Sequence, residues 1–165
     1  MAIVWRDSDH GALLAAPQDE PIEGERPTML LLGFEPARAM TLVRLLSPLV
    51  RVRLATRLRD AVDMARDLQP DAIALGGAID GADVATVLAA FQAGAMLEDI
   101  PVIVLAAGDG DASERDALRG GALAWLPHTA SAEALLSRVR LAVRMRRSYS
   151  PRWGSAATAP TRDPR

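Results

Sequence analysis

Apolar residues follow two alternating patterns from residue 28 onward and show no sustained period before it. Nearly continuous apolar runs are typical of strands that are covered on both faces, whereas repeats at three- and four-residue spacing are typical of amphipathic helices. The first pattern predicts strands at residues 29–34, 50–55, 72–75, 101–106 and 122–126. The second predicts helices at residues 36–46, 58–68, 83–93, 112–120 and 131–147.

The regular alternation of strands and helices predicts the fold class. Strands that alternate with helices form a mostly parallel sheet with helices on both faces. Five such units favour a flavodoxin-like (βα)5 fold, which is a doubly wound parallel α/β sheet with the strand order 2-1-3-4-5. In this order the carboxyl ends of the first and third strands frame a crevice. Residues 50–55 alternate with period two, which indicates an edge strand with one exposed face.

The chain divides into one domain with a polar segment at each end. We expect residues 28–147 to form the domain, since half of all residues are apolar and can build a core. Residues 1–27 contain three prolines and predict a disordered N-terminal arm. Residues 148–165 are rich in Pro, Ser and Arg and predict a disordered C-terminal tail.

Composition narrows the possible chemistry. The chain has no cysteine, which excludes disulfides and thiol catalysis and fits a cytoplasmic protein. No apolar run approaches the roughly 20 residues that a membrane span needs. All the basic side chains are arginine, so no lysine is present to form a Schiff base. Neither a G-x-G-x-x-G loop nor a Walker loop occurs, which disfavours a nucleotide-dependent enzyme.

Four segments in the correct order carry a resemblance to a known family. They are "MLLLGFEPARAMTLVRLL", "LQPDAIALGGAIDGADV", "IPVIVLAA" and "GGALAWLPHTASAEALLSRVR". With them, residues 28–147 resemble a response-regulator receiver domain, the CheY-like fold of two-component and phosphorelay signalling in bacteria. The resemblance implies a phosphoacceptor site in the crevice.

The residues that such a receiver needs at this site are replaced. The resemblance implies an acidic pair that holds Mg²⁺, a phosphoacceptor Asp, a hydroxyl residue and a lysine. Their positions are taken by Gly33 and Phe34, by Gly76, by Ala106 and by His128. We therefore expect no phosphoacceptor, no metal and no cofactor. The chain is interpreted as a stand-alone pseudo-receiver that acts by phosphorylation-independent protein–protein interaction.

The acidic residues near the crevice do not restore the site. Mg²⁺ prefers oxygen ligands, commonly one or two carboxylates with waters. Glu35 beside an aromatic residue is a poor substitute, and Asp80 and Asp83 lie too far along the loop. Glu35 and His128 are also the only crevice groups for acid–base work, so we do not expect an enzyme. His128 has two interpretations. It is either a titrating switch or a polar residue at the rim of the crevice.

The resemblance implies that signals pass through the surface of helix four, strand five and helix five. A partner there would be a histidine kinase, a response regulator or a motor or effector component, and a homodimer through the same face is an alternative. Trp125 reads either as an interface anchor or as half-buried packing, and the helix-five arginines also fit a hydrated face. The candidate surface residues are Arg115, Arg119, Trp125, Arg138 and Arg140.

The C-terminal segment suggests a different function. Residues 144–153 combine four arginines with a Tyr and a Trp, and are faintly similar to the C-terminal extension of CheY-like cyclic-di-GMP effectors. Guanidinium groups match phosphates and guanine edges, and aromatic rings stack on bases. The alternative function is therefore cyclic-di-GMP binding, and a nonspecific basic tail is the plainer interpretation. The candidate nucleotide-binding residues are Arg144, Arg146, Arg147, Arg152 and Trp153.

Overall fold

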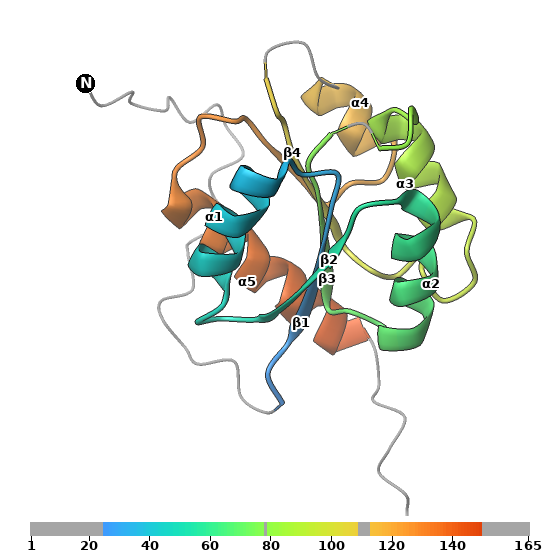
Figure 1. The fold of residues 1–165 in the computed structure, drawn as a ribbon. Coiled ribbons are helices and arrows are strands. Elements are labelled where there is room, and N and C mark those ends of the chain that lie inside the picture. Colours follow the sequence, from blue (N-terminus) through green and yellow to red (C-terminus); the bar gives the residue numbers. More distant parts are fainter. Residues whose placement is uncertain (1–24, 78, 109–112, 150–165) are drawn as a thin grey trace, which may run out of the picture.

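A five-stranded parallel sheet lies between two layers of helices in the computed structural model, which describes residues 25–77, 79–108 and 113–149 (Figure 1). The strands are hydrogen-bonded in the order β2-β1-β3-β4-β5, as the alternation of elements predicted. All pairs are parallel. The strands are β1 (Thr28–Leu32), β2 (Arg51–Ala55), β3 (Ala72–Leu75), β4 (Val102–Leu105) and β5 (Ala124–Leu126).

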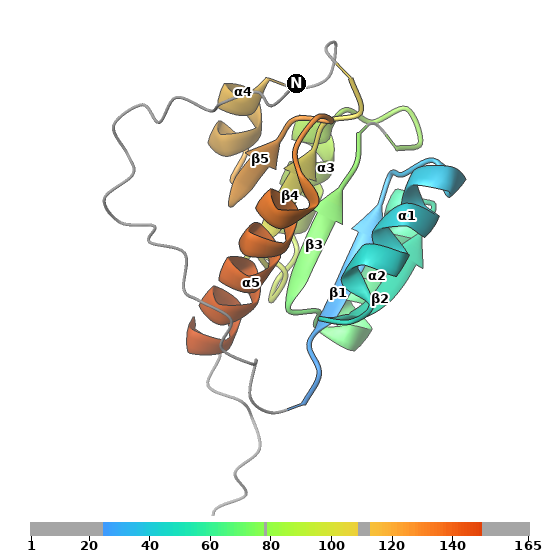
Figure 2. The ribbon, with the colours of Figure 1, turned by 90° about the vertical axis from the view of Figure 1, so that its left-hand side faces the viewer.

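The helices cover both faces of the sheet, with α1 and α5 on one side and α2, α3 and α4 on the other (Figure 2). None of the helices within the described ranges is long and apolar enough to cross a membrane. The helices are α1 (Pro36–Leu46), α2 (Leu58–Leu68), α3 (Val84–Gln92), α4 (Glu114–Arg119) and α5 (Ala132–Tyr149).

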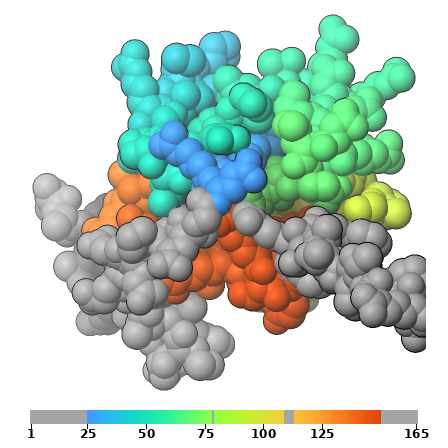
Figure 3. Space-filling model, turned by 90° about the horizontal axis from the view of Figure 1, so that it is seen from below, coloured from blue at the N-terminus to red at the C-terminus, as the bar shows by residue number. Residues whose placement is uncertain are grey.

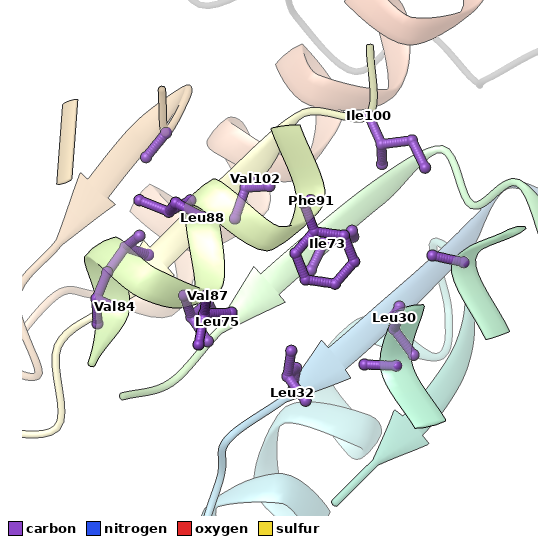
Figure 4. Packing of buried hydrophobic residues seen from close by; sticks show 14 of the residues in the cluster. Leu30, Leu32, Ile73, Leu75, Val84, Val87, Leu88, Phe91, Ile100 and Val102 are labelled. Carbon is purple, nitrogen blue, oxygen red and sulfur yellow. The ribbon is translucent and has the colours of Figure 1, made fainter. Parts of the chain in front are cut away.

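Alternate residues of the central strands divide the core into two clusters. Successive side chains of a strand point to opposite faces. In β1, Leu30 and Leu32 therefore join the cluster under α2 and α3, whereas Met29 and Leu31 join the cluster under α1 and α5. Figure 4 shows the first cluster, in which Phe91 of α3 lies over the sheet. Burying a side chain of this size stabilises the fold by about 1.5–3 kcal/mol.

Polar side chains define the starts of three helices. Asp83 precedes α3 and accepts a hydrogen bond from the Thr86 amide at 2.8 Å. Ser113 accepts from the Asp116 amide at the start of α4. At α5 the Ser131 hydroxyl accepts from the Ala134 amide at 3.1 Å. These bonds satisfy amides that have no partner within the helix.

Both ends of the domain reach slightly beyond the expected limits. Helix α5 continues to Tyr149, two residues past the predicted end. Before β1, the Arg51 amide donates to the Pro27 carbonyl at 2.7 Å, and Arg26 donates to the carbonyls of Ser47 and Pro48. The last residues of the expected arm are thus tied to the domain. The rest of the expected arm and tail lies outside the described residues.

Candidate functional site

The loops that follow β1 and β3 approach each other closely at the carboxyl edge of the sheet. The Gly76 amide donates to the Leu32 carbonyl at 2.8 Å. Gly33 has a φ of +74°, and a Cβ atom there would lie 3.1 Å from the Gly77 carbonyl oxygen. A left-handed backbone in such tight contact favours glycine. Glycine at position 33 therefore allows the two loops to approach each other, and it has no carboxylate.

The ring of Phe34 lies where a side chain of residue 76 would be. A Cβ atom on Gly76 would be 2.6 Å from the Phe34 Cε1 atom and 2.7 Å from the Gly33 carbonyl oxygen. Both distances are too short for nonbonded atoms. The Arg38 guanidinium lies 5.6 Å from the centre of the same ring, within the range of a cation–π contact. The predicted site is thus filled by an aromatic ring with an arginine over it.

The other two positions of the predicted site contribute little polar chemistry. Ala106, just after β4, is 3% exposed, and its amide donates to the Leu126 carbonyl at 2.9 Å. His128 lies two residues beyond the end of β5 and is exposed. Of the five replaced positions, His128 alone has an ionisable side chain.

Two of the three nearby carboxylates accept hydrogen bonds from backbone amides. Asp80 Oδ2 accepts from the Leu58 amide at the start of α2, at 2.8 Å. The hydrogen bonds from Thr86 lower the pKa of Asp83. Glu35 precedes α1 and makes no side-chain capping bond. Within the described ranges, no three His, Cys, Asp or Glu residues are grouped so that they could hold a metal ion.

The predicted interaction surface spans α4, the edge strand β5 and α5. Arg115 and Arg119 are exposed on α4. Trp125 is half-buried and packs against the core cluster under α2, α3 and α4. Arg138 and Arg140 are half-buried on α5. Leu118 was not predicted as part of this surface. It is 45% exposed between the two arginines of α4, and the apolar pattern of the sequence does not distinguish it from a core residue.

The predicted nucleotide-binding residues are divided between a helix and the undescribed tail. Arg144, Arg146 and Arg147 belong to α5, whereas residues 152 and 153 lie outside the described residues. Arg146 donates to Gln69 Oε1 at 2.9 Å. Arg147 forms an ion pair with Asp71 at 3.2 Å. Two of the arginines assigned to a nucleotide are therefore engaged within the domain.

The architecture and strand order are those of a response-regulator receiver domain, the CheY-like fold. No protein-family model and no curated protein matches the sequence. Among solved structures, a putative response regulator from Chloroflexus aurantiacus J-10-fl matches with a TM-score of 0.67 at 21% identity, over 73% of this chain and 99% of that chain. These values establish the fold.

Two further receiver domains show the same likeness. The signal receiver domain of an HD domain-containing protein from Pseudomonas fluorescens Pf-5 matches with a TM-score of 0.66 at 23% identity, over 74% of this chain and 98% of that chain. The receiver domain of a sensor histidine kinase from Pseudomonas aeruginosa PAO1 has a TM-score of 0.64 at 20% identity, over 72% of this chain and 98% of that chain. That structure has a magnesium ion coordinated in its active-site cleft.

Proposed function

We propose that this chain is a pseudo-receiver, a receiver-like signalling module that acts through protein contacts without being phosphorylated. The observation that carries the proposal is the Phe34 ring beside Gly76. Position 76 is a glycine and has no side chain to carry a carboxylate. The space next to it is occupied by the ring of Phe34. The fold is retained, while the groups that a phosphoryl transfer needs are missing.

The chemistry of the crevice supports this reading. Phosphoryl transfer depends on positioning a nucleophile and on a cation that neutralises developing charge. Mg²⁺ binds carboxylate, carbonyl and water oxygens, and the receiver domain from Pseudomonas aeruginosa holds this ion in its cleft. Here Gly33 and Phe34 replace the acidic pair, and Asp80 and Asp83 accept hydrogen bonds from the starts of α2 and α3.

The output surface proposed for this module is the α4–β5–α5 face. Arg115 and Arg119 flank the exposed Leu118, with Trp125 half-buried on the adjoining strand. Arginine and tryptophan are enriched among the residues that dominate binding energies. The partner in this proposal is a signalling protein of the cytoplasm, such as a histidine kinase, a response regulator or an effector component. No catalytic role is assigned to the chain.

The contacts of α5 count against cyclic-di-GMP as the ligand. Arg146 and Arg147 would have to leave Gln69 and Asp71 before they could reach a phosphate or a guanine. Isothermal titration of the full chain with cyclic-di-GMP tests this alternative directly. Saturable binding that is lost in Arg152→Ala or Trp153→Ala would restore it.

The proposed function is tested by comparing captured partners. The full chain is used as bait in lysate of the native cell, with and without acetyl phosphate and Mg²⁺. A partner of this surface is retained by the unaltered chain and by the control Arg53→Gln/Arg57→Gln, and is lost with Arg115→Gln/Arg119→Gln. Its recovery is the same with and without the phosphodonor. Recovery that depends on the phosphodonor would overturn the proposal.

A further inference from the structure

Charge is distributed unequally between the two helical layers. Helices α1 and α5 together contain seven arginines and a single acidic residue, Glu133. Helices α2, α3 and α4 contain four arginines and five acidic residues. The layer formed by α1 and α5 therefore has a strong positive charge, although the whole chain has a formal net charge of −2. A surface of this kind attracts an anionic segment.

Three arginines form a stripe along α5. Arg140, Arg144 and Arg147 are spaced by four and three residues, which places them on the same side of the helix. Arg140 and Arg144 are half-buried on this flank, away from the side that faces the sheet. We call these three residues the α5 arginine stripe. Arg147 already pairs with Asp71 and donates to the Glu25 carbonyl, so it anchors one end of the stripe, and Arg140 and Arg144 are the residues considered for binding an anionic segment.

The N-terminal segment enters the domain at the C-terminal end of this stripe. The Arg147 guanidinium donates to the Glu25 carbonyl, and the Glu25 carboxylate lies 3.6 Å from the Arg51 guanidinium. Figure 3 views this end of the molecule and shows the blue residues at the start of the described chain close to the orange and red atoms of α5. The described chain therefore begins beside the C-terminal end of the stripe.

The tethered segment has the complementary charge and sufficient length. Residues 1–24 contain five acidic residues and one arginine. The helical rise of about 1.5 Å per residue places Arg140 about 10 Å from Arg147 along α5. An extended chain covers that distance in about three residues. The acids nearest to the tether, Asp19, Glu20 and Glu23, are thus within reach of the stripe.

We propose that residues 1–24 bind in cis to the α5 arginine stripe. The tether at Glu25 makes this binding intramolecular, so a weak ionic contact is favoured by a high effective concentration. Arg140 is also among the residues predicted for the α4–β5–α5 face. On that prediction, an acidic partner that contacts Arg140 would compete with the acidic segment. Binding of the N-terminal segment goes beyond the proposed function. It is measured in the absence of a partner, so its failure is distinguishable from failure of the proposed function.

The chain has no cysteine, so a single introduced cysteine can be labelled selectively in the full chain. A nitroxide is attached to Gln18→Cys, and broadening of the backbone amide signals is measured by NMR at low salt. Broadening is expected along α5 near the stripe and not along α3. It should largely disappear at about 0.5 M NaCl, where the screening length falls to a few ångströms. Broadening that is uniform over the domain or unchanged by salt would overturn the proposal.

Charge variants separate the stripe from general attraction to the domain. Arg140→Gln/Arg144→Gln should abolish the selective broadening, whereas the control Arg115→Gln/Arg119→Gln on α4 should leave it unchanged. Asp19→Asn/Glu20→Gln/Glu23→Gln should have the same effect as the stripe variant and does not alter a residue of the described domain. Labelled chain is also mixed with ¹⁵N chain that lacks the nitroxide. Broadening in that mixture would show binding to a second copy and would overturn the cis arrangement.

Discussion

The two ends of the sheet differ in how they use polar residues. At the carboxyl end, where receiver-type chemistry is expected, Gly33, Phe34, Gly76 and Ala106 place no ionisable group in the predicted site. At the amino end, Asp71 accepts from the Thr28 amide at 2.8 Å and pairs with Arg147 at 3.2 Å. The comparison teaches that side-chain contacts at the amino end join distant segments of the chain, whereas the predicted site at the carboxyl end is occupied by an aromatic ring.

The amino-end contacts join segments that are far apart in the sequence. Asp71 links the starts of β1 and β3 to the last turns of α5, and Arg146 links the same turns to Gln69 at the end of α2. The side chains of Asp71 and Arg147 are only 22% and 20% exposed. An ion pair in such an environment is screened less than one in open water. We therefore expect the polar contacts at the amino end to contribute more to the free energy of unfolding than the polar contacts at the carboxyl end.

The largest effect is expected when a carboxylate is returned to the carboxyl end. Gly76→Asp should lower the free energy of unfolding by about 3 kcal/mol, because its Cβ atom would overlap the Phe34 ring and the Gly33 carbonyl. Urea unfolding monitored by circular dichroism measures the change.

A matched control keeps the chemistry of this substitution and changes its surroundings. A Cβ atom on Gly108 would meet nothing within 4 Å, so Gly108→Asp should change stability by less than about 0.5 kcal/mol. The double variant Gly76→Asp/Phe34→Ala should recover part of the loss. Equal stability of Gly76→Asp and the unaltered chain would contradict the assignment of Phe34 as the residue that fills the site.

The next effect is expected at the amino end. Asp71→Ala removes the acceptor of both the Thr28 amide and Arg147, and should cost about 2 kcal/mol after allowance for partial exposure. The exposed Asp67 of α2 is the control, and Asp67→Ala should change stability by less than about 0.5 kcal/mol. If the two variants unfold at the same urea concentration, the amino-end network does not stabilise the fold.

A smaller effect is expected from the carboxylate that caps α3. Hydrogen bonds from Thr86 lower the pKa of Asp83 in the folded protein. A lowered pKa means that the cap stabilises the fold fully above the ordinary pKa of aspartate and less as pH falls through the folded value. The difference in stability between the unaltered chain and Asp83→Ala should therefore shrink on acidification below about pH 4. A difference that is constant from pH 7 to pH 3 would exclude the charged cap.

No effect is expected from the ligands of a phosphorylated receiver. Acetyl phosphate with Mg²⁺ should leave the intact mass unchanged, because position 76 has no nucleophile. Mg²⁺ alone should not raise the melting temperature, since a ligand stabilises only as far as it binds the native state. A phosphate adduct near residues 76–83, or a saturable shift in melting temperature, would show that a site persists at the carboxyl end.

The sequence by itself determined the order of the elements and the strand order. The apolar runs at residues 72–75 and 101–106 and the helical repeat at residues 58–68 are local patterns, and the elements they predict are present. That positions 33, 34 and 76 have no carboxylate is also read directly from residue identity. The prediction of the elements is confirmed because hydrophobic period depends on the residues themselves.

The tertiary structure alone decided what those residues touch. Phe34 meets Gly76 across 42 positions of the chain, and Arg147 meets Asp71 across 76, and neither contact leaves a trace in local periodicity. Arg146 and Arg147 were predicted to serve a nucleotide because an arginine-rich segment is typical of a binding tail. Both lie in the helix predicted at residues 131–147, and packing of its apolar face decides that their guanidinium groups meet Gln69 and Asp71.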